Sequence, residues 1–174
     1  MIRQRVTLGL AAALLVAGCG DADEPAPQPS PAGPLAPGQA KLPPQASDFP
    51  ALASKDCVEV AQFYFEAIGG HEFEQAALVW DDPVIDGARL EALFGEYKEP
   101  QIAWTEPFVE GAAGTLHCTI SGALTDAADP KKVRVEGTLL LQRTNDVPGA
   151  TADQLRWTIR SSTFLERLER SQRG

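Results

Sequence analysis

The stretch that decides the fold is DCVEVAQFYFEAIGG, residues 56–70. Its apolar residues are interrupted only by Glu59, Gln62 and Glu66, which recur at helical spacing. This pattern predicts a helix with one narrow polar stripe and an otherwise buried surface. Asp56 is a typical N-cap residue, and paired glycines commonly end a helix. We therefore expect a helix from Asp56 to about Ile68 that other parts of the chain cover.

Two more helices are expected directly downstream. Helical spacing of apolar residues predicts one over about 72–80, with Trp80 on its buried face, and another over about 88–97, with Tyr97 on its buried face. The Asp82-Pro83 dipeptide should end the first of them, because the residue before a proline disfavours helical backbone.

After Pro100 the apolar period changes from helical spacing to two. Alternation predicts strands over 102–108, 116–124, 133–141 and 155–160, with turns at 129–130 and 145–149. Helices followed by a run of strands predict an α+β fold. The end of the chain, 166–174, is expected to be a charged tail that frays.

Two segments carry a family resemblance. Residues 64–68 and 73–77 resemble the opening helix pair of NTF2-like (SnoaL-like, cystatin-like) domains, and 141–157 resembles a hairpin of small bacterial lipoproteins of this type. The resemblance covers about 56–164. It implies a cone in which three N-terminal helices pack on a curved, mainly antiparallel sheet of four long strands, with a short extra strand at Val84-Ile85. It implies no single function, because this fold hosts enzymes, binding proteins and assembly modules.

The first residues are typical of a signal peptide. Arg3 and Arg5 precede an apolar run that is too short for a transmembrane helix. The run ends in VAGC, residues 16–19, which resembles a bacterial lipobox. The resemblance implies that residues 1–18 are removed and that Cys19 is lipidated. An ordinary secretory signal with an incidental cysteine is the alternative. The residue after the cysteine is Gly20 and not aspartate, and in bacterial lipoproteins this favours the outer membrane over the inner one.

A proline-rich segment follows the expected anchor. Residues 20–54 hold nine of the chain's 14 prolines and show no helical or strand periodicity. Such a sequence cannot bury enough apolar surface to offset its ordering entropy. We expect a disordered tether over 19–54 that separates the membrane from a folded domain over 55–165.

Net charge and cysteine count limit the binding partners and the cellular compartment that are consistent with the sequence. The net charge is −9, and removing residues 1–18 makes it −11. This argues against binding to nucleic acid or to anionic lipid headgroups, which requires a cationic surface. If Cys19 is lipidated, Cys57 and Cys118 are the pair left to oxidise outside the cytoplasm. The sequence leaves open whether they form a disulfide or remain separate buried thiols.

The NTF2-like resemblance implies a cavity between helices and sheet, where enzymes of that superfamily place a carboxylate base and hydrogen-bond donors. Tyr64 is the donor candidate, and Asp81 and Asp82 are the acidic candidates. The alternative for Tyr64 is a tyrosine that only packs in the core. The alternative for Asp81 and Asp82 is a solvated helix end without a catalytic role. The expected pocket-lining residues are the aromatic residues Tyr64, Trp80, Tyr97 and Trp104.

No cofactor or metal ion is expected. His71 and His117 lie at unrelated positions without ligand spacing to other metal-binding residues. The leading hypothesis is a periplasm-facing, lipid-anchored envelope protein whose domain binds a small apolar ligand or a protein partner without catalysis. The rival is a small isomerase or dehydratase that uses Tyr64 and a carboxylate. A third hypothesis is homodimerisation through the sheet face.

Overall fold

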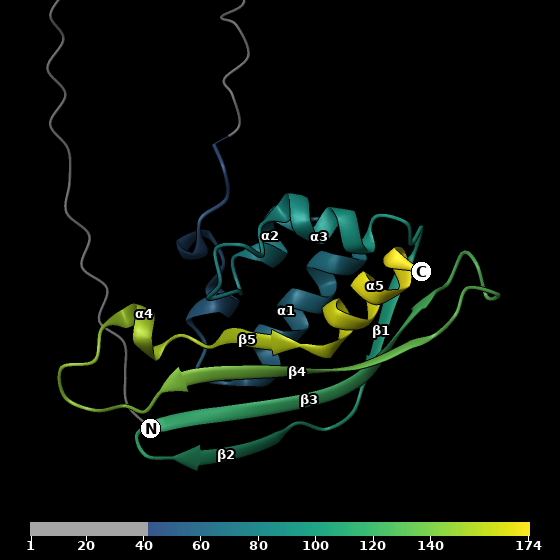
Figure 1. Ribbon diagram of the computed structural model, residues 1–174. Helices are drawn as coiled ribbons and strands as arrows, with labels where there is room; N and C mark the ends of the chain where they lie inside the picture. Colours follow the sequence, from purple (N-terminus) through teal and green to yellow (C-terminus); the bar gives the residue numbers. More distant parts are fainter. Residues whose placement is uncertain (1–41) are drawn as a thin grey trace, which may run out of the picture. The chain divides into compact units, whose positions relative to one another are not determined.

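A computed structural model describes residues 42–174 (Figure 1), so the signal peptide, Cys19 and most of the expected tether lie outside the described residues. In chain order the elements are η1 (Ala46–Asp48), η2 (Pro50–Ala53), α1 (Cys57–Gly69), α2 (Phe73–Ala77), α3 (Gly87–Phe94), β1 (Pro100–Trp104), β2 (Phe108–Ala112), β3 (Thr115–Asp126), β4 (Val135–Thr144), α4 (Ala152–Leu155), β5 (Thr158–Ser162) and α5 (Thr163–Arg173). No helix in this part of the chain is long and apolar enough to cross a bilayer.

Helix α1 forms as its sequence predicts. The Asp56 side chain accepts a hydrogen bond from the Val58 N–H at 2.9 Å, which satisfies one of the free donors of the first turn. The stripe of Glu59, Gln62 and Glu66 is exposed, and most of the remaining surface of the helix is buried. Burial of this apolar surface, more than helix propensity, holds α1 in place.

The sheet is antiparallel and centred on β3. Its order is β1-β3-β4-β5, and β2 also pairs with β3. Residues Cys118, Ile120 and Leu124 of β3 point to the core, as the period of two requires. Helices α1, α2, α3 and α5 lie over one face of the sheet (Figure 1). The predicted α+β class with helices before an antiparallel sheet is therefore confirmed.

A disulfide joins Cys57 to Cys118 in the structure. The two Cα atoms are 6.4 Å apart, and both side chains are buried. The bond connects the first turn of α1 to the first half of β3, across a sequence separation of 61 residues. It therefore fastens the helix layer to the sheet.

The first predicted strand, 102–108, is wrong in its extent. It is two strands, because β1 ends at Trp104 and β2 begins at Phe108. Pro107 lies between them and has no N–H to donate to a neighbouring strand. Phe108 is 63% exposed and does not face the core as the alternation predicted. The sheet thus has five strands, and only β3 and β4 are long.

The predicted helix over 72–80 is too long. Helix α2 ends at Ala77, and the chain then extends so that the Ile159 N–H donates to the Val79 carbonyl at 2.8 Å. Trp80 forms a single parallel bridge with Ile159, while Val84-Ile85 lies in a turn and not in the expected short strand. Pairing with β5 overrides the helical pattern here.

The helix expected over 88–97 also differs at both ends. Helix α3 starts one residue earlier, at Gly87, where the Asp86 side chain accepts from the Arg89 N–H at 2.8 Å. It ends at Phe94, so Tyr97 lies in the following turn and not on the helix.

The boundaries of the folded region were also predicted wrongly. The expected charged tail is helix α5, which Ser162 caps and which buries Phe164, Leu165 and Leu168. At the other end, Leu52 of η2 is buried, so the packed region begins before residue 55. The predicted strands at 133–141 and 155–160 shift to β4 and β5, because Val133 is exposed and residues 152–155 form α4.

Candidate functional site

The predicted donor, Tyr64, lies inside the core. Its side chain is 1% exposed, and its ring packs against Phe65 and Trp80 with centroid distances of 5.8 and 6.3 Å. Within residues 42–174, neither its hydroxyl nor the Trp80 indole N–H has a hydrogen-bond partner of acceptable geometry. Burial raises the pKa of the Tyr64 hydroxyl far above its ordinary value, and the nearby Trp80 N–H offsets only part of that rise. Tyr64 is therefore a neutral phenol enclosed by aromatic rings.

The two predicted carboxylates lie at the surface. Asp81 forms an ion pair with Arg160, and its side chain is 51% exposed. Asp82 accepts a hydrogen bond from the Val84 N–H at 2.9 Å, which is the turn chemistry of an aspartate before proline. The structure does not bring either carboxylate to the Tyr64 hydroxyl. An acid/base pair between them is absent from the described residues.

Tyr97 is buried next to Lys132. The Lys132 ammonium group is 4.0 Å from the centre of the Tyr97 ring and donates to the Glu96 carbonyl at 2.7 Å. Burial raises the pKa of Tyr97, and the charges of Glu96 and Asp126 raise it further. These contacts give the residue a structural role in the turn after α3.

The histidines are separate surface residues. His71 has a positive φ of 58° and its Nε2 lies 3.2 Å from the Lys98 carbonyl oxygen. His117 lies on β3 opposite Glu110 and Gln142. No group of three potential metal ligands occurs among residues 42–174.

Trp104 is the predicted pocket residue that borders open space. It is half-buried at the end of β1, and its ring centroid is 6.0 Å from that of Phe65. It lines two open grooves of about 590 and 450 Å³. The larger groove runs between α1 and β1, and the smaller one continues over β3 and β4 to α5.

Two glycines line the smaller groove. Gly122 pairs with Trp104 on one side and with Gly137 on the other. The space next to both glycines is occupied: a Cβ atom would lie 2.6 Å from the Ala103 carbonyl oxygen at Gly122 and 2.5 Å from the Phe164 ring at Gly137. The two glycines therefore allow β1 to approach β3 closely and α5 to pack closely on β4.

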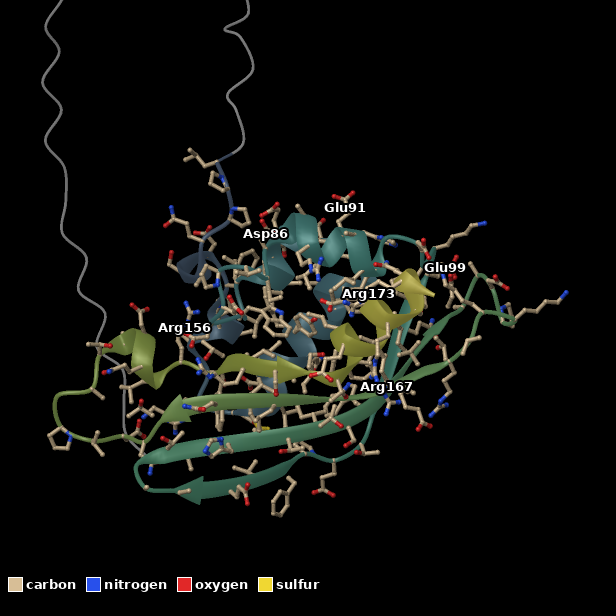
Figure 2. All side chains as sticks on the ribbon, viewed as in Figure 1. Asp86, Glu91, Glu99, Arg156, Arg167 and Arg173 are labelled. Atoms are coloured by element: carbon tan, nitrogen blue, oxygen red, sulfur yellow. A yellow bond between two sulfur atoms is a disulfide. The ribbon has the colours of Figure 1, made fainter. Side chains whose placement is uncertain are left out.

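The walls of the smaller groove are polar and cationic. Arg134 and Arg167 supply two positive charges and Glu136 supplies one negative charge. Hydroxyl groups come from Thr105, Ser121, Thr138 and Thr163. Arg167 points from α5 toward the sheet (Figure 2) and has no ion-pair partner within residues 42–174. Arg134 lies 3.8 Å from Glu136, and both side chains are mostly exposed.

The arrangement provides groups that can bind a ligand. A half-exposed indole provides apolar contact area, and the hydroxyl and guanidinium groups around it provide directional hydrogen bonds. Sequence reasoning missed Arg134 and Arg167 as site residues. The available signal was the pair of glycines at inward-facing positions of two neighbouring strands, which is unusual in a strand interior.

Comparison with known proteins gives no family assignment. No model of a known protein family matches the sequence, and no curated protein matches it. Bd1075 of Bdellovibrio bacteriovorus is a similar solved structure, with 10% identity, a TM-score of 0.44, and coverage of 62% of this chain and 38% of that one.

Two streptomycete structures are also similar. An NTF2-like family protein of Streptomyces avermitilis has 12% identity, a TM-score of 0.41, and coverage of 61% of this chain and 90% of that one. Aln2 of another Streptomyces strain has 20% identity, a TM-score of 0.41, and coverage of 61% and 86%. Likenesses of this strength assign no activity to this chain.

Proposed function

We propose that this protein is a lipid-anchored protein of the bacterial envelope whose NTF2-like domain binds a partner without catalysing a reaction. The anchor is supported by the VAGC sequence at residues 16–19 and by the proline-rich segment that follows it. The NTF2-like assignment is supported by the resemblance over 56–164 and by the arrangement of three early helices on an antiparallel sheet.

One observation carries the non-catalytic part of the proposal. The tyrosine that an isomerase or dehydratase would use is 1% exposed, and no carboxylate is hydrogen-bonded to it within residues 42–174. A substrate proton requires a base within hydrogen-bond reach, and the candidates Asp81 and Asp82 are engaged at the surface. The rival enzyme hypothesis needs a route to Tyr64 that this arrangement does not provide.

The grooves at Trp104 favour an extended partner. They are open and share Ala103 and Trp104 in their linings, which suits a segment of protein that crosses Trp104 better than an enclosed small molecule. Tryptophan and arginine are the residue types that most often dominate protein interfaces. We infer that an acidic, partly apolar segment of an envelope protein binds across Trp104, with Arg167 facing its charge.

Cross-linking in the envelope tests this function. A photo-reactive residue at Thr105 should form a discrete covalent adduct, and Arg167→Glu should remove that adduct. Arg170→Glu is the matched control, because Arg170 lies on the same helix and does not line the groove. If Arg167→Glu and Arg170→Glu affect the adduct equally, groove binding is wrong. Turnover that is abolished by Tyr64→Phe would instead support the enzyme.

A further inference from the structure

A second charged pocket, of about 250 Å³, lies beside α4 and shares no residue with the grooves at Trp104. Three arginines line it: Arg143 from β4, Arg156 after α4, and Arg160 from β5. The chain has only 15 lysines and arginines against 24 acidic residues. The meeting of three guanidinium groups in one small pocket is therefore not a consequence of average composition. Figure 2 shows Arg156 at this end of the domain, far from Arg167.

Arg143 is a buried cation with incomplete compensation. It is 8% exposed, and its guanidinium carbon lies 5.5 Å from the centre of the Trp157 ring. One terminal nitrogen donates to the Thr144 carbonyl at 3.0 Å and to Asp146 at 3.2 Å. Its Nε is buried with no partner in the described part of the chain. Burial of a charged group is costly unless it is fully paired, so the Arg143 charge is incompletely compensated within the described part of the protein.

Asp146 does not neutralise Arg143 alone. Its side chain is 49% exposed, and it also accepts a hydrogen bond from the Lys55 ammonium group at 2.9 Å. Lys55 and Arg143 together lower the pKa of Asp146, with the Lys55 hydrogen bond as the largest cause. One carboxylate thus faces two cations, which leaves excess positive charge next to the pocket.

Arg156 and Arg160 are also held in place by contacts within the protein. A terminal nitrogen of Arg156 donates to the Leu78 carbonyl at 3.2 Å, and its buried Nε has no partner within residues 42–174. Arg160 forms the ion pair with Asp81. Contacts that fix a guanidinium group before a ligand arrives reduce the entropy lost on binding.

The acidic residues of the pocket set the charge of the ligand. Asp81 and Asp153 line it together with the three arginines. Three cations and two carboxylates leave one net positive charge, which matches a monoanion better than a phosphate dianion. The remaining polar lining consists of hydroxyl and amide side chains, namely Gln142, Thr144, Gln154 and Thr158.

We propose that this pocket binds a small molecule through a carboxylate group, which Arg156 and Arg143 hold. Guanidinium groups form paired hydrogen bonds with carboxylates, and such charge-assisted bonds are about twice as strong as neutral ones. The volume of about 250 Å³ fits a small molecule. This site is separate from the Trp104 grooves, so it stands whether or not the protein binds a partner there.

Titration of the full chain carrying Cys19→Ser tests the site. The arginine Nε–H resonances are followed by ¹H–¹⁵N NMR while acetate replaces chloride at constant ionic strength. We expect saturable shifts of Arg143 and Arg156. Arg156→Gln should weaken binding by about tenfold, because a charge-assisted hydrogen bond is lost. Arg134→Gln is the matched control, since Arg134 is exposed and does not line this pocket.

Three results would overturn the proposal. They are shifts that do not saturate, equal weakening by Arg134→Gln, and tighter binding of inorganic phosphate than of acetate. If Arg156→Gln does not fold, Arg160→Gln replaces it, because the Arg160 side chain is 47% exposed and its removal leaves the core intact. That variant should also weaken acetate binding, and unchanged binding would contradict the site.

Discussion

Gly137 of β4 lies directly against the ring of Phe164 in α5. A Cβ atom at position 137 would be 2.5 Å from Cγ of that ring, which is closer than real contacts allow. Through this contact, α5 packs against the sheet. We expect Gly137→Ala to destabilise the domain by about 1–3 kcal/mol, the usual cost of overpacking. Urea unfolding measures this loss of stability. Gly111→Ala is the control, because a Cβ atom at position 111 would lie 3.4 Å from its nearest neighbour, which is an ordinary contact distance. Equal stability of the two variants would show that α5 does not pack on Gly137.

The disulfide should be a major source of stability. It closes a loop across a separation of 61 residues, and the chain-entropy model gives about 4 kcal/mol for a loop of this length. We expect the Cys57→Ala/Cys118→Ala double variant to lose most of that free energy of unfolding. Denaturant unfolding of oxidised wild type, reduced wild type and the double variant measures the loss. Identical stability before and after reduction would contradict the bond.

Asp126 should make stability depend on pH. Its carboxylate is buried and accepts hydrogen bonds from the Lys98 and Glu99 N–H groups at 2.9 and 3.0 Å. Burial raises its pKa, but the backbone hydrogen bonds and the charge of Lys132 outweigh burial, so the net shift is downward. Because the folded-state pKa lies below the unfolded one, the ionised group stabilises the fold above the unfolded pKa. This stabilisation is lost as pH falls below about 4.

The matching experiment compares Asp126→Asn with wild type from pH 3 to pH 7 (about one unit below to three above the ordinary aspartate pKa). We expect the variant to be less stable at neutral pH, with the difference shrinking in acid. Asp129→Asn is the control, because Asp129 accepts only the nearby Lys131 N–H at 3.1 Å among its side-chain contacts within residues 42–174. A difference that stays constant with pH would contradict the role of the Asp126 charge.

Removal of the Tyr64 hydroxyl tests whether this group is buried in the core without a hydrogen-bond partner. A buried hydroxyl without a partner costs desolvation energy, so Tyr64→Phe should leave the free energy of unfolding unchanged within about 0.5 kcal/mol, or raise it. Thermal unfolding measures the effect. A loss above about 1 kcal/mol would show that the hydroxyl has a hydrogen-bond partner.

The proposed lipidation at Cys19 predicts that the chain is found in the membrane fraction. Cys19→Ser should move the protein from the membrane fraction to the soluble fraction, because acyl chains contribute about 0.8 kcal/mol per buried CH₂ group. Fractionation with immunodetection checks this, and Cys57→Ser is the control that alters a cysteine without altering the proposed anchor. Retention of the Cys19→Ser variant on membranes would contradict the lipobox.

The sequence by itself determined the local features of this protein. The N-cap at Asp56, the polar stripe of α1 and the inward positions of β3 follow from side-chain chemistry and periodicity within a few residues. These features depend on short-range geometry, with periods of about 3.6 and 2, and they were sufficient to predict the α+β class.

Tertiary structure decided the features that depend on contacts distant in sequence. Val79 bonds to Ile159 and so ends α2 early, and Phe164 meets Gly137 and so turns a charged tail into a packed helix. The same holds for the candidate sites. Trp104 was visible as an aromatic residue, but the smaller groove beside it also requires Arg167 of α5. The arginine pocket requires strands and loops that converge only in the folded chain. Periodicity reports which side of an element is buried, whereas only the packed chain determines which residues meet there.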